Sequence, residues 1–158
     1  MSDRVNLGKA APQLYQAVAE LERLASARAE AAGLAKGFTH LLRLRASQIN
    51  GCAFCLDMHT IDARAAGETE QRLYVLSAWR EAPFYTPRER AALAWTESVT
   101  LVGQTHVPDE VYAEAREQFN EEELVNLTWA IVVINGWNRM NVAFRTPVGD
   151  YVSPHGKK

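Results

Sequence analysis

The sequence has little of what marks exported, membrane-spanning or nucleic-acid-binding proteins. Only two of its 158 residues are cysteine, too few for the disulfide framework that stabilises small secreted domains. The 17 basic and 19 acidic residues are interspersed, so no cationic stripe can neutralise the phosphates of nucleic acid or of an anionic membrane. The longest nearly apolar run, residues 127–134, is far shorter than the roughly 18 residues of a membrane-spanning helix. We therefore expect neither nucleic acid nor a membrane as a partner.

The N-terminus lacks the apolar stretch of a secretory signal, which predicts a cytoplasmic protein. In such a reducing compartment, a close pair of cysteines is more often catalytic or metal-binding than structural. The composition, 47% hydrophobic and 23% charged, is that of an ordinary globular chain, and its length suits one domain over residues 1–158.

Apolar residues recur at spacings of three and four, and no stretch alternates in the manner of a β-strand. The sequence therefore predicts an all-α, single-domain bundle of about seven helices. Capping boxes at Thr86 with Glu89 and at Asn120 with Glu123 mark two helix starts, and Asn50 is the expected N-cap of the helix that carries the cysteines. The expected helices cover residues 12–31, 36–49, 52–67, 69–82, 86–102, 108–119 and 120–144, with a loop at 103–107 and an irregular tail at 146–158.

Two of these helices have a clear apolar pattern. In the first, Leu14, Val18, Leu21 and Leu24 share one face, which predicts a packing surface. The last helix is expected to be largely buried over residues 124–137.

The residues that carry chemistry lie together in one short segment. If this segment is helical, Cys52, Cys55 and His59 fall within roughly 60° of one another. A helix N-terminus stabilises a thiolate and a neighbouring imidazole can take the thiol proton, so both lower the pKa of a cysteine. A sulfenic acid formed by attack on a peroxide would then condense with the second thiol to a Cys52–Cys55 disulfide. The segment predicts a thiol enzyme that reduces a hydroperoxide or a disulfide.

Three other interpretations of the cysteines stay open. Cys-x-x-Cys is half of many zinc sites and His59 could add a third ligand, but His40, His106 and His155 lie at no recognisable spacing for a fourth. A haem attachment motif needs histidine directly after the second cysteine, where this chain has leucine. The cysteines could also be small buried hydrophobes. The alternative function is therefore a non-enzymatic redox-responsive or metal-binding helical module.

Three stretches resemble the alkylhydroperoxidase D (AhpD-like) branch of the carboxymuconolactone decarboxylase superfamily. They are LRLRASQINGCAFCLDMH at residues 42–59, DARAAGE at 62–68 and INGWNR at 134–139, and the similarity covers about residues 38–145. The resemblance implies an all-helical fold that assembles as trimers or hexamers. It also implies a peroxidase that takes a hydroperoxide substrate and electrons from a dithiol donor protein, with no cofactor beyond a redox-active Cys52–Cys55 disulfide.

Carried onto this chain, the resemblance makes Cys55 the peroxidatic thiol, Cys52 the resolving thiol and His59 part of a proton relay. It disfavours decarboxylation, because the decarboxylase branch lacks the cysteine pair. The family's relay begins with a glutamate twelve residues before the first cysteine, where this chain has His40, and Phe54 replaces a histidine between the cysteines. His40 could pass protons through a water, or it could be a packing residue; it cannot supply the fixed charge of a carboxylate.

Other polar residues near the motif are expected to have structural roles. An exposed helix face or a turn explains Asp57 and Glu68, and Glu97 could replace the missing carboxylate only through a tertiary contact. A network that packs helices or subunits together is the favoured role for the polar residues after the last apolar segment, which are Asn135, Trp137, Asn138 and Arg139.

Overall fold

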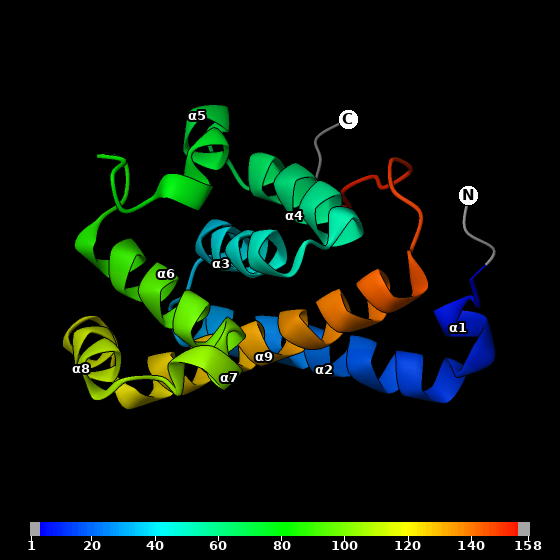
Figure 1. Cartoon of the computed structure of the whole chain (residues 1–158), viewed down its shortest axis with the longest axis horizontal. Helices are drawn as coiled ribbons and strands as arrows, with labels where there is room; N and C mark the ends of the chain where they lie inside the picture. The colour runs from blue at the N-terminus through cyan, green and yellow to red at the C-terminus, as the bar shows by residue number, and fades with distance from the viewer. Residues whose placement is uncertain (1–3, 155–158) are drawn as a thin grey trace.

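The structure is a computed structural model that describes residues 4–154, and within these residues it is helical without any β-strand (Figure 1). The predicted all-α fold is therefore confirmed for the described part of the chain. Nine α-helices are present there, together with one short 3₁₀ helix, η1, at Leu76–Ala78. The α-helices are Leu7–Ala10 (α1), Pro12–Ala31 (α2), Lys36–Asn50 (α3), Ala53–Ala65 (α4), Glu70–Tyr74 (α5), Pro87–Thr100 (α6), Val102–Thr105 (α7), Asp109–Gln118 (α8) and Glu121–Phe144 (α9).

The two longest helices, α2 and α9, pack against each other in opposite directions along the lower edge of Figure 1. Helix α3 lies against both of them and also against α4 and α6, which makes it the central helix of the bundle. Its central position explains why eight of its residues are buried, including the polar His40, Arg43 and Ser47. The chain leaves α9 and returns over α4, so residues 146–154 lie beside the helix that carries the cysteines.

Both predicted capping boxes are present. The Thr86 side chain accepts a hydrogen bond from the Glu89 amide and the Glu89 carboxylate accepts one from the Thr86 amide, and Asn120 and Glu123 exchange the same pair of bonds. These reciprocal bonds satisfy amides that have no partner inside the helix, so each helix begins where its sequence signal lies.

The prediction of about seven helices was too low, and one predicted helix is broken. The single turns α1 and α7 were missed, because one turn is too short to produce a periodic apolar pattern. The predicted helix at 69–82 divides into α5 and η1. The Tyr85 hydroxyl donates to the Arg72 carbonyl, which a continuous helix would have paired with the Leu76 amide. The turn that follows buries both Leu76 and Trp79 in the main core.

The join between α3 and α4 differs from the prediction that Asn50 caps the cysteine helix. Asn50 is the last residue of α3, and its side-chain amide donates to Asn135 and to Asn138 on α9, each at 2.9 Å. Gly51 then adopts a left-handed conformation, φ +66°, that ends α3. Cys52 takes the N-cap position of α4, where its sulfur accepts a hydrogen bond from the Cys55 amide.

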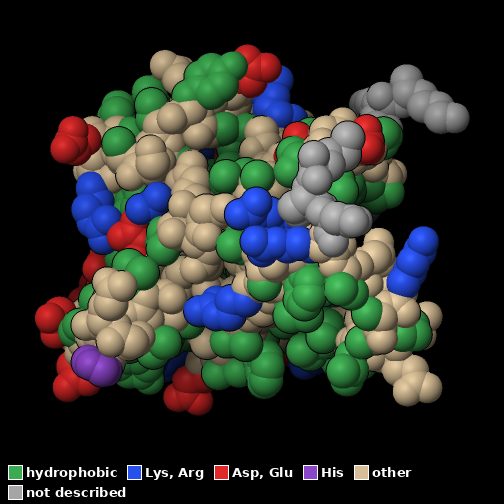
Figure 2. All heavy atoms as spheres, turned by 45° about the vertical axis from the view of Figure 1, so that its right-hand side comes forward, with side chains coloured by type: hydrophobic (Ala, Val, Ile, Leu, Met, Phe, Trp, Pro, Cys, Tyr) green, Lys and Arg blue, Asp and Glu red, His purple; other side chains and the backbone are tan. Residues whose placement is uncertain are grey.

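A large apolar surface remains exposed on α2 and α9. The predicted face of α2 exists, but it does not pack in the core: Leu14 is 71% exposed, and Val18, Leu21 and Leu24 are also exposed. Only the small residues Ala25 and Ala29 are buried in α2. On α9 a stripe at helical spacing is also exposed: Val125, Trp129 and Val132 lie within the segment expected to be largely buried, and Met140 lies beyond it. Figure 2 shows apolar side chains gathered on the lower part of one face, at the level of these two helices.

Over residues 4–154, no helix combines the length and the apolar character that crossing a membrane requires.

Candidate functional site

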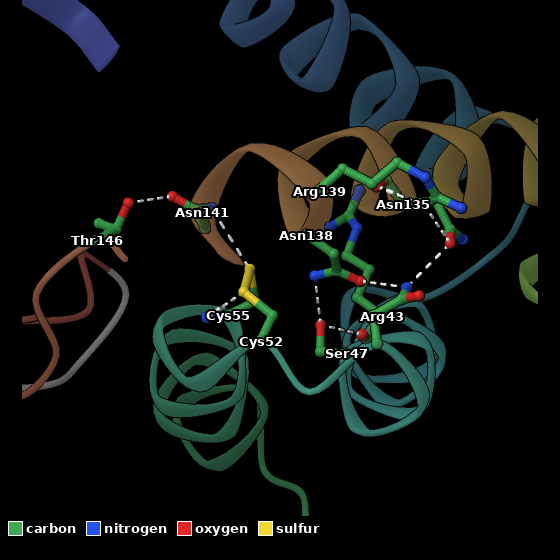
Figure 3. Close-up of a disulfide and its surroundings, with 10 residues drawn as sticks. Arg43, Ser47, Cys52, Cys55, Asn135, Asn138, Arg139, Asn141 and Thr146 are labelled. Carbon is green, nitrogen blue, oxygen red and sulfur yellow. Dashed lines mark hydrogen bonds between the residues drawn. A yellow bond between two sulfur atoms is a disulfide. The ribbon is translucent and has the colours of Figure 1, made fainter. Parts of the chain in front are cut away.

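The two cysteines form a disulfide at the point where α4 meets α9 (Figure 3). Both are almost completely buried, with 1% of Cys52 and none of Cys55 exposed, and they pack with Ala46 of α3 and Ile134 of α9. The local fold brings the sulfurs together, because Cys52 caps α4 and Cys55 sits in its first turn, with 5.4 Å between their Cα atoms. This separation lies in the usual range for disulfides.

The sulfur of Cys55 has a polar partner on α9. The Asn141 side-chain amide donates to it over 3.5 Å, and the carbonyl oxygen of Asn141 accepts a hydrogen bond from the Thr146 hydroxyl at 2.7 Å (Figure 3). The Thr146 contact fixes the orientation of the amide, so that its NH₂ group points to the sulfur. A donor in this position favours a thiolate over a thiol, as the N-terminus of α4 also does.

Two histidines from neighbouring helices face each other beside the cysteines. His40 of α3 and His59 of α4 are both buried, and their Nδ1 atoms lie 3.3 Å apart. Burial, followed by the positive charges of Arg43 and His40, holds the pKa of His59 well below its ordinary value. Nε2 of His59 is buried and has no hydrogen-bond partner within the described residues. His59 is therefore a neutral imidazole with an unsatisfied nitrogen.

An ion pair between a buried arginine and a partly exposed glutamate lies next to the histidines. Arg43 of α3 is 4% exposed and contacts Glu22 of α2 at 2.6 Å, and it also donates to Ser26 at 2.9 Å. Its Nε has no partner within the described residues. Glu22 is partly exposed, so its carboxylate stays in contact with solvent while it pairs with the buried Arg43.

A carboxylate completes the group of buried polar residues. Asp62 lies one turn after His59 on α4, and the Tyr151 hydroxyl, in the C-terminal segment, donates to its two oxygens at 3.0 and 2.9 Å. Burial, together with this hydrogen bond and the nearby charge of Asp62, raises the pKa of Tyr151 to about 12. The His40, His59 and Asp62 side chains each offer one ligand atom, and these three atoms lie within 4.8 Å of one another.

These side chains border a cavity of about 1050 Å³. Cys55, His59, His40, Arg43 and Asp62 line it, but Cys52 does not. Apolar side chains form much of the remaining wall, among them Tyr15, Phe54, Met58, Trp137 and Phe144. Residues from the N-terminal segment, from α2 and from the C-terminal segment close it on the other sides. A volume of this size accommodates a small organic molecule.

Of the predicted site residues, the structure brings Cys55, His59 and His40 to one cavity, with Cys52 bonded to Cys55 behind it. Other candidates lie elsewhere. Glu97 binds Arg45, Trp79 and Arg80 and does not line the cavity. Asp57 accepts from the Gly149 amide, Glu68 pairs with Arg72, and His106 is exposed at the end of α7. His155 lies outside the described residues.

The sequence analysis missed four residues of the site. Asp62 carried a signal, since it follows Cys55 by seven residues and His59 by three and so shares their face of α4. Arg43, Asn141 and Tyr151 had no local signal, because they reach the site only through tertiary contacts. The expected polar network at the end of α9 is confirmed: Asn138 donates to Ser47, and Asn135 to Thr100, each at 3.0 Å.

Comparison with known proteins gives the family. Residues 12–98 match the carboxymuconolactone decarboxylase family. The uncharacterized protein YdfG of Bacillus subtilis is 44% identical over 143 residues, which is 90% of this chain and 95% of that protein. YnjA of Escherichia coli, also uncharacterized, is 27% identical over 107 residues, 68% of this chain and 58% of that protein.

A solved structure is equally similar. A protein of unknown function from Agrobacterium tumefaciens, provisionally described as the antioxidant defence protein AhpD, is 45% identical and superposes with a TM-score of 0.86, covering 94% of this chain and all of that one. The AhpD core of a peroxidase-related protein from Ralstonia eutropha shares the fold at 21% identity and a TM-score of 0.67, over 81% of this chain and 70% of that one. The family match, the Agrobacterium structure and the Cys-x-x-Cys pair at the start of α4 agree, and the chain belongs to the AhpD-like branch of the carboxymuconolactone decarboxylase family.

Proposed function

We propose that this protein is a thiol-dependent peroxidase or disulfide reductase that cycles Cys52 and Cys55 between a dithiol and a disulfide. The observation that carries the proposal is the position of the pair: the two sulfurs are bonded to each other, and Cys55 lines a cavity that Cys52 does not reach. The name of the Agrobacterium relative, which refers to antioxidant defence, agrees with it.

In the proposed reaction, the Cys55 thiolate attacks the terminal oxygen of a hydroperoxide. The O–O bond breaks, the leaving alkoxide takes a proton to become an alcohol, and Cys55 becomes a sulfenic acid. The Cys52 thiolate then attacks the sulfur of Cys55, forming the disulfide and releasing the hydroxyl group as water. A dithiol donor protein supplies the two electrons that restore both thiols.

The surrounding groups support Cys55 as the attacking sulfur. The amide of Asn141 and the first turn of α4 both favour negative charge on it. His59, kept neutral by burial and by Arg43, offers a nitrogen that can take up the thiol proton and return it to the leaving alkoxide. The aromatic and aliphatic part of the cavity wall suits the organic group of a hydroperoxide.

The test is peroxide consumption by the wild-type protein and by two serine variants, with dithiothreitol as the reductant. Cys55→Ser is expected to abolish turnover. Cys52→Ser, assayed without dithiothreitol, is expected to consume one equivalent of peroxide and to leave a sulfenic acid on Cys55 that dimedone traps. Full turnover by Cys55→Ser would contradict the assignment, as would dimedone labelling of Cys52 in Cys55→Ser without labelling of Cys55 in Cys52→Ser.

A second candidate function is a non-enzymatic, redox-responsive module, and the near-complete burial of both sulfurs favours it. In that case peroxide would oxidise the pair once and slowly, without repeated turnover. Multiple turnovers under excess reductant, measured by the disappearance of cumene hydroperoxide, separate the two candidates.

We further propose that the protein acts as a homo-oligomer, a trimer or a hexamer. The exposed apolar residues of α2 and α9 form a surface too extensive for an isolated soluble chain, and burying them between copies would remove them from water.

A further inference from the structure

We propose that His40, His59 and Asp62 bind one divalent first-row transition-metal ion at the wall of the cavity. This cluster differs from a zinc site built on the cysteines, because both sulfurs are used in the disulfide. The ligands are two imidazoles and one carboxylate, the combination that iron, zinc and cobalt ions accept and that calcium and magnesium do not favour.

The geometry of the cluster fits an ion of this size. Two nitrogens bound to one tetrahedral ion at 2.0–2.1 Å lie about 3.4 Å apart, and the Nδ1 atoms of His40 and His59 are 3.3 Å apart. Because all three ligand atoms lie within 4.8 Å of one another, an ion at their centre is at most about 2.8 Å from each of them. Side-chain shifts on the order of 0.6 Å bring the ligands to bonding distance.

The charges around the cluster favour a cation. Asp62 contributes a buried negative charge, and Arg43, whose positive charge also acts on His59, pairs with Glu22 at 2.6 Å. The Tyr151 hydroxyl holds the Asp62 carboxylate without adding charge, and each oxygen keeps a lone pair for an ion. Ligating carboxylates are usually held by a hydrogen bond from a second residue, and Tyr151 supplies that bond here.

The helices hold the three ligands in place before an ion arrives. His59 and Asp62 are one turn apart on α4, and His40 comes from α3, which packs against α4. Protein side chains supply three ligands, so the remaining coordination positions face the cavity, where water or a small molecule can complete them. The arrangement therefore resembles an open metal site more than a closed structural one.

The experiment is titration of the oxidised, metal-free protein with Zn²⁺ by calorimetry, with visible absorption of the Co²⁺ form as a second measurement. Oxidation keeps the thiols from acting as ligands, so the result does not depend on peroxidase activity. We expect one ion per chain. Asp62→Asn, which keeps an oxygen for Tyr151 but removes the charge, and His40→Gln should each weaken binding at least 10-fold.

The chain offers matched controls in its other two histidines. His106→Asn removes an exposed imidazole and keeps a residue that tolerates the left-handed conformation there, and His155→Asn removes the last histidine. Neither should change binding. Tyr151→Phe, which alters no ligand, should weaken binding about 10- to 100-fold and keeps the test valid where a cluster variant fails to fold.

Three results would each overturn the proposal. The first is the absence of binding by the oxidised wild-type protein. The second is unchanged affinity in Asp62→Asn, His40→Gln and Tyr151→Phe, and the third is loss of binding in the His106 or His155 control. None of these results bears on the thiol reaction, and loss of peroxidase activity would leave the metal proposal intact.

Discussion

Reduction of the Cys52–Cys55 disulfide should lower the free energy of unfolding by only about 2 kcal/mol. The two residues are three positions apart, so the bond closes a loop of four residues. The entropy that such a bond removes from the unfolded chain grows with the logarithm of loop length, and for a loop this short it is about 2 kcal/mol at 25 °C. A structural disulfide that closes a loop of about 100 residues contributes more than twice as much.

The residues around the Cys52–Cys55 disulfide should add little to the stability that is lost on reduction. Once reduced, Cys52 and Cys55 remain small apolar side chains beside Ala46 and Ile134, and Asn141 can still donate to the Cys55 sulfur. The N-cap of α4 is kept, because the Cys52 sulfur still accepts from the Cys55 amide. The fold should therefore persist through the redox cycle, as repeated turnover requires.

Urea unfolding followed by circular dichroism, with and without tris(2-carboxyethyl)phosphine, measures the difference. We expect a loss of about 2 kcal/mol and a fall in melting temperature of about 4 to 8 °C. The double variant Cys52→Ser/Cys55→Ser is the control, and reductant should not change its stability. A loss above about 4 kcal/mol, or unfolding on reduction, would refute the reasoning and identify the bond as a structural one.

Three other predictions concern packing, charge and assembly. Asn138→Ala should lower the free energy of unfolding by about 2–4 kcal/mol in urea melts, because Asn138 is fully buried and hydrogen-bonded to Asn50 and Ser47. The same change at the partly exposed Asn126 is the control and should lower it by about 0.5 kcal/mol or less. Burial alone would raise the pKa of Glu97, but hydrogen bonds from Trp79, Arg80 and Arg45 outweigh it and hold the pKa below the model-peptide value of 4.5. The stability that the Glu97 carboxylate contributes is thus present above about pH 4.5 and is lost as the pH falls through the lowered pKa. Glu97→Gln should therefore lower the free energy of unfolding by about 2 kcal/mol at pH 7, and its difference from wild type should shrink in acid. Leu14→Glu combined with Trp129→Glu should leave the fold intact, since both side chains are exposed, but should convert the oligomer to a monomer in sedimentation velocity.

Outcomes that contradict these three predictions are equally definite. Equal losses of unfolding free energy in Asn138→Ala and Asn126→Ala would show that the buried hydrogen bonds of Asn138 contribute nothing to stability beyond helix propensity. A difference between Glu97→Gln and wild type that stays constant down to pH 3 would show that the carboxylate is not preferentially charged in the folded state. A monomeric wild-type protein would remove the case for assembly through α2 and α9.

The sequence predicted what depends on neighbouring residues. The bounds of α2, both capping boxes and the pairing of two cysteines three positions apart all follow from local spacing, and the structure confirms them. Local spacing also predicted that α3 ends near Gly51. It did not predict that the Asn50 side chain would donate hydrogen bonds to Asn135 and Asn138 of α9.

The parts of the site that could not be predicted are those built by long-range contacts. Asn141 is 86 residues from Cys55, and Tyr151 is 89 residues from Asp62. No periodicity connects such positions, so each residue resembles an ordinary polar side chain in the sequence. The exposure of the apolar face of α2 could not be predicted for a related reason: periodicity shows which residues share a face, but it does not tell whether that face lies in the core.

In this chain the negative charge of the site lies on α4, because position 40 of α3 is a histidine and Asp62 is the buried carboxylate. A carboxylate at position 40 would strengthen His59 as a base, whereas the imidazole of His40 gives it no such support and, when charged, lowers the pKa of His59. The buried charge belongs instead to Asp62, which the C-terminal segment holds through Tyr151. His40→Glu therefore tests both proposals in one variant. It should speed peroxide reduction where proton transfer limits the rate, and it should retain metal binding, because a carboxylate replaces an imidazole among the ligands.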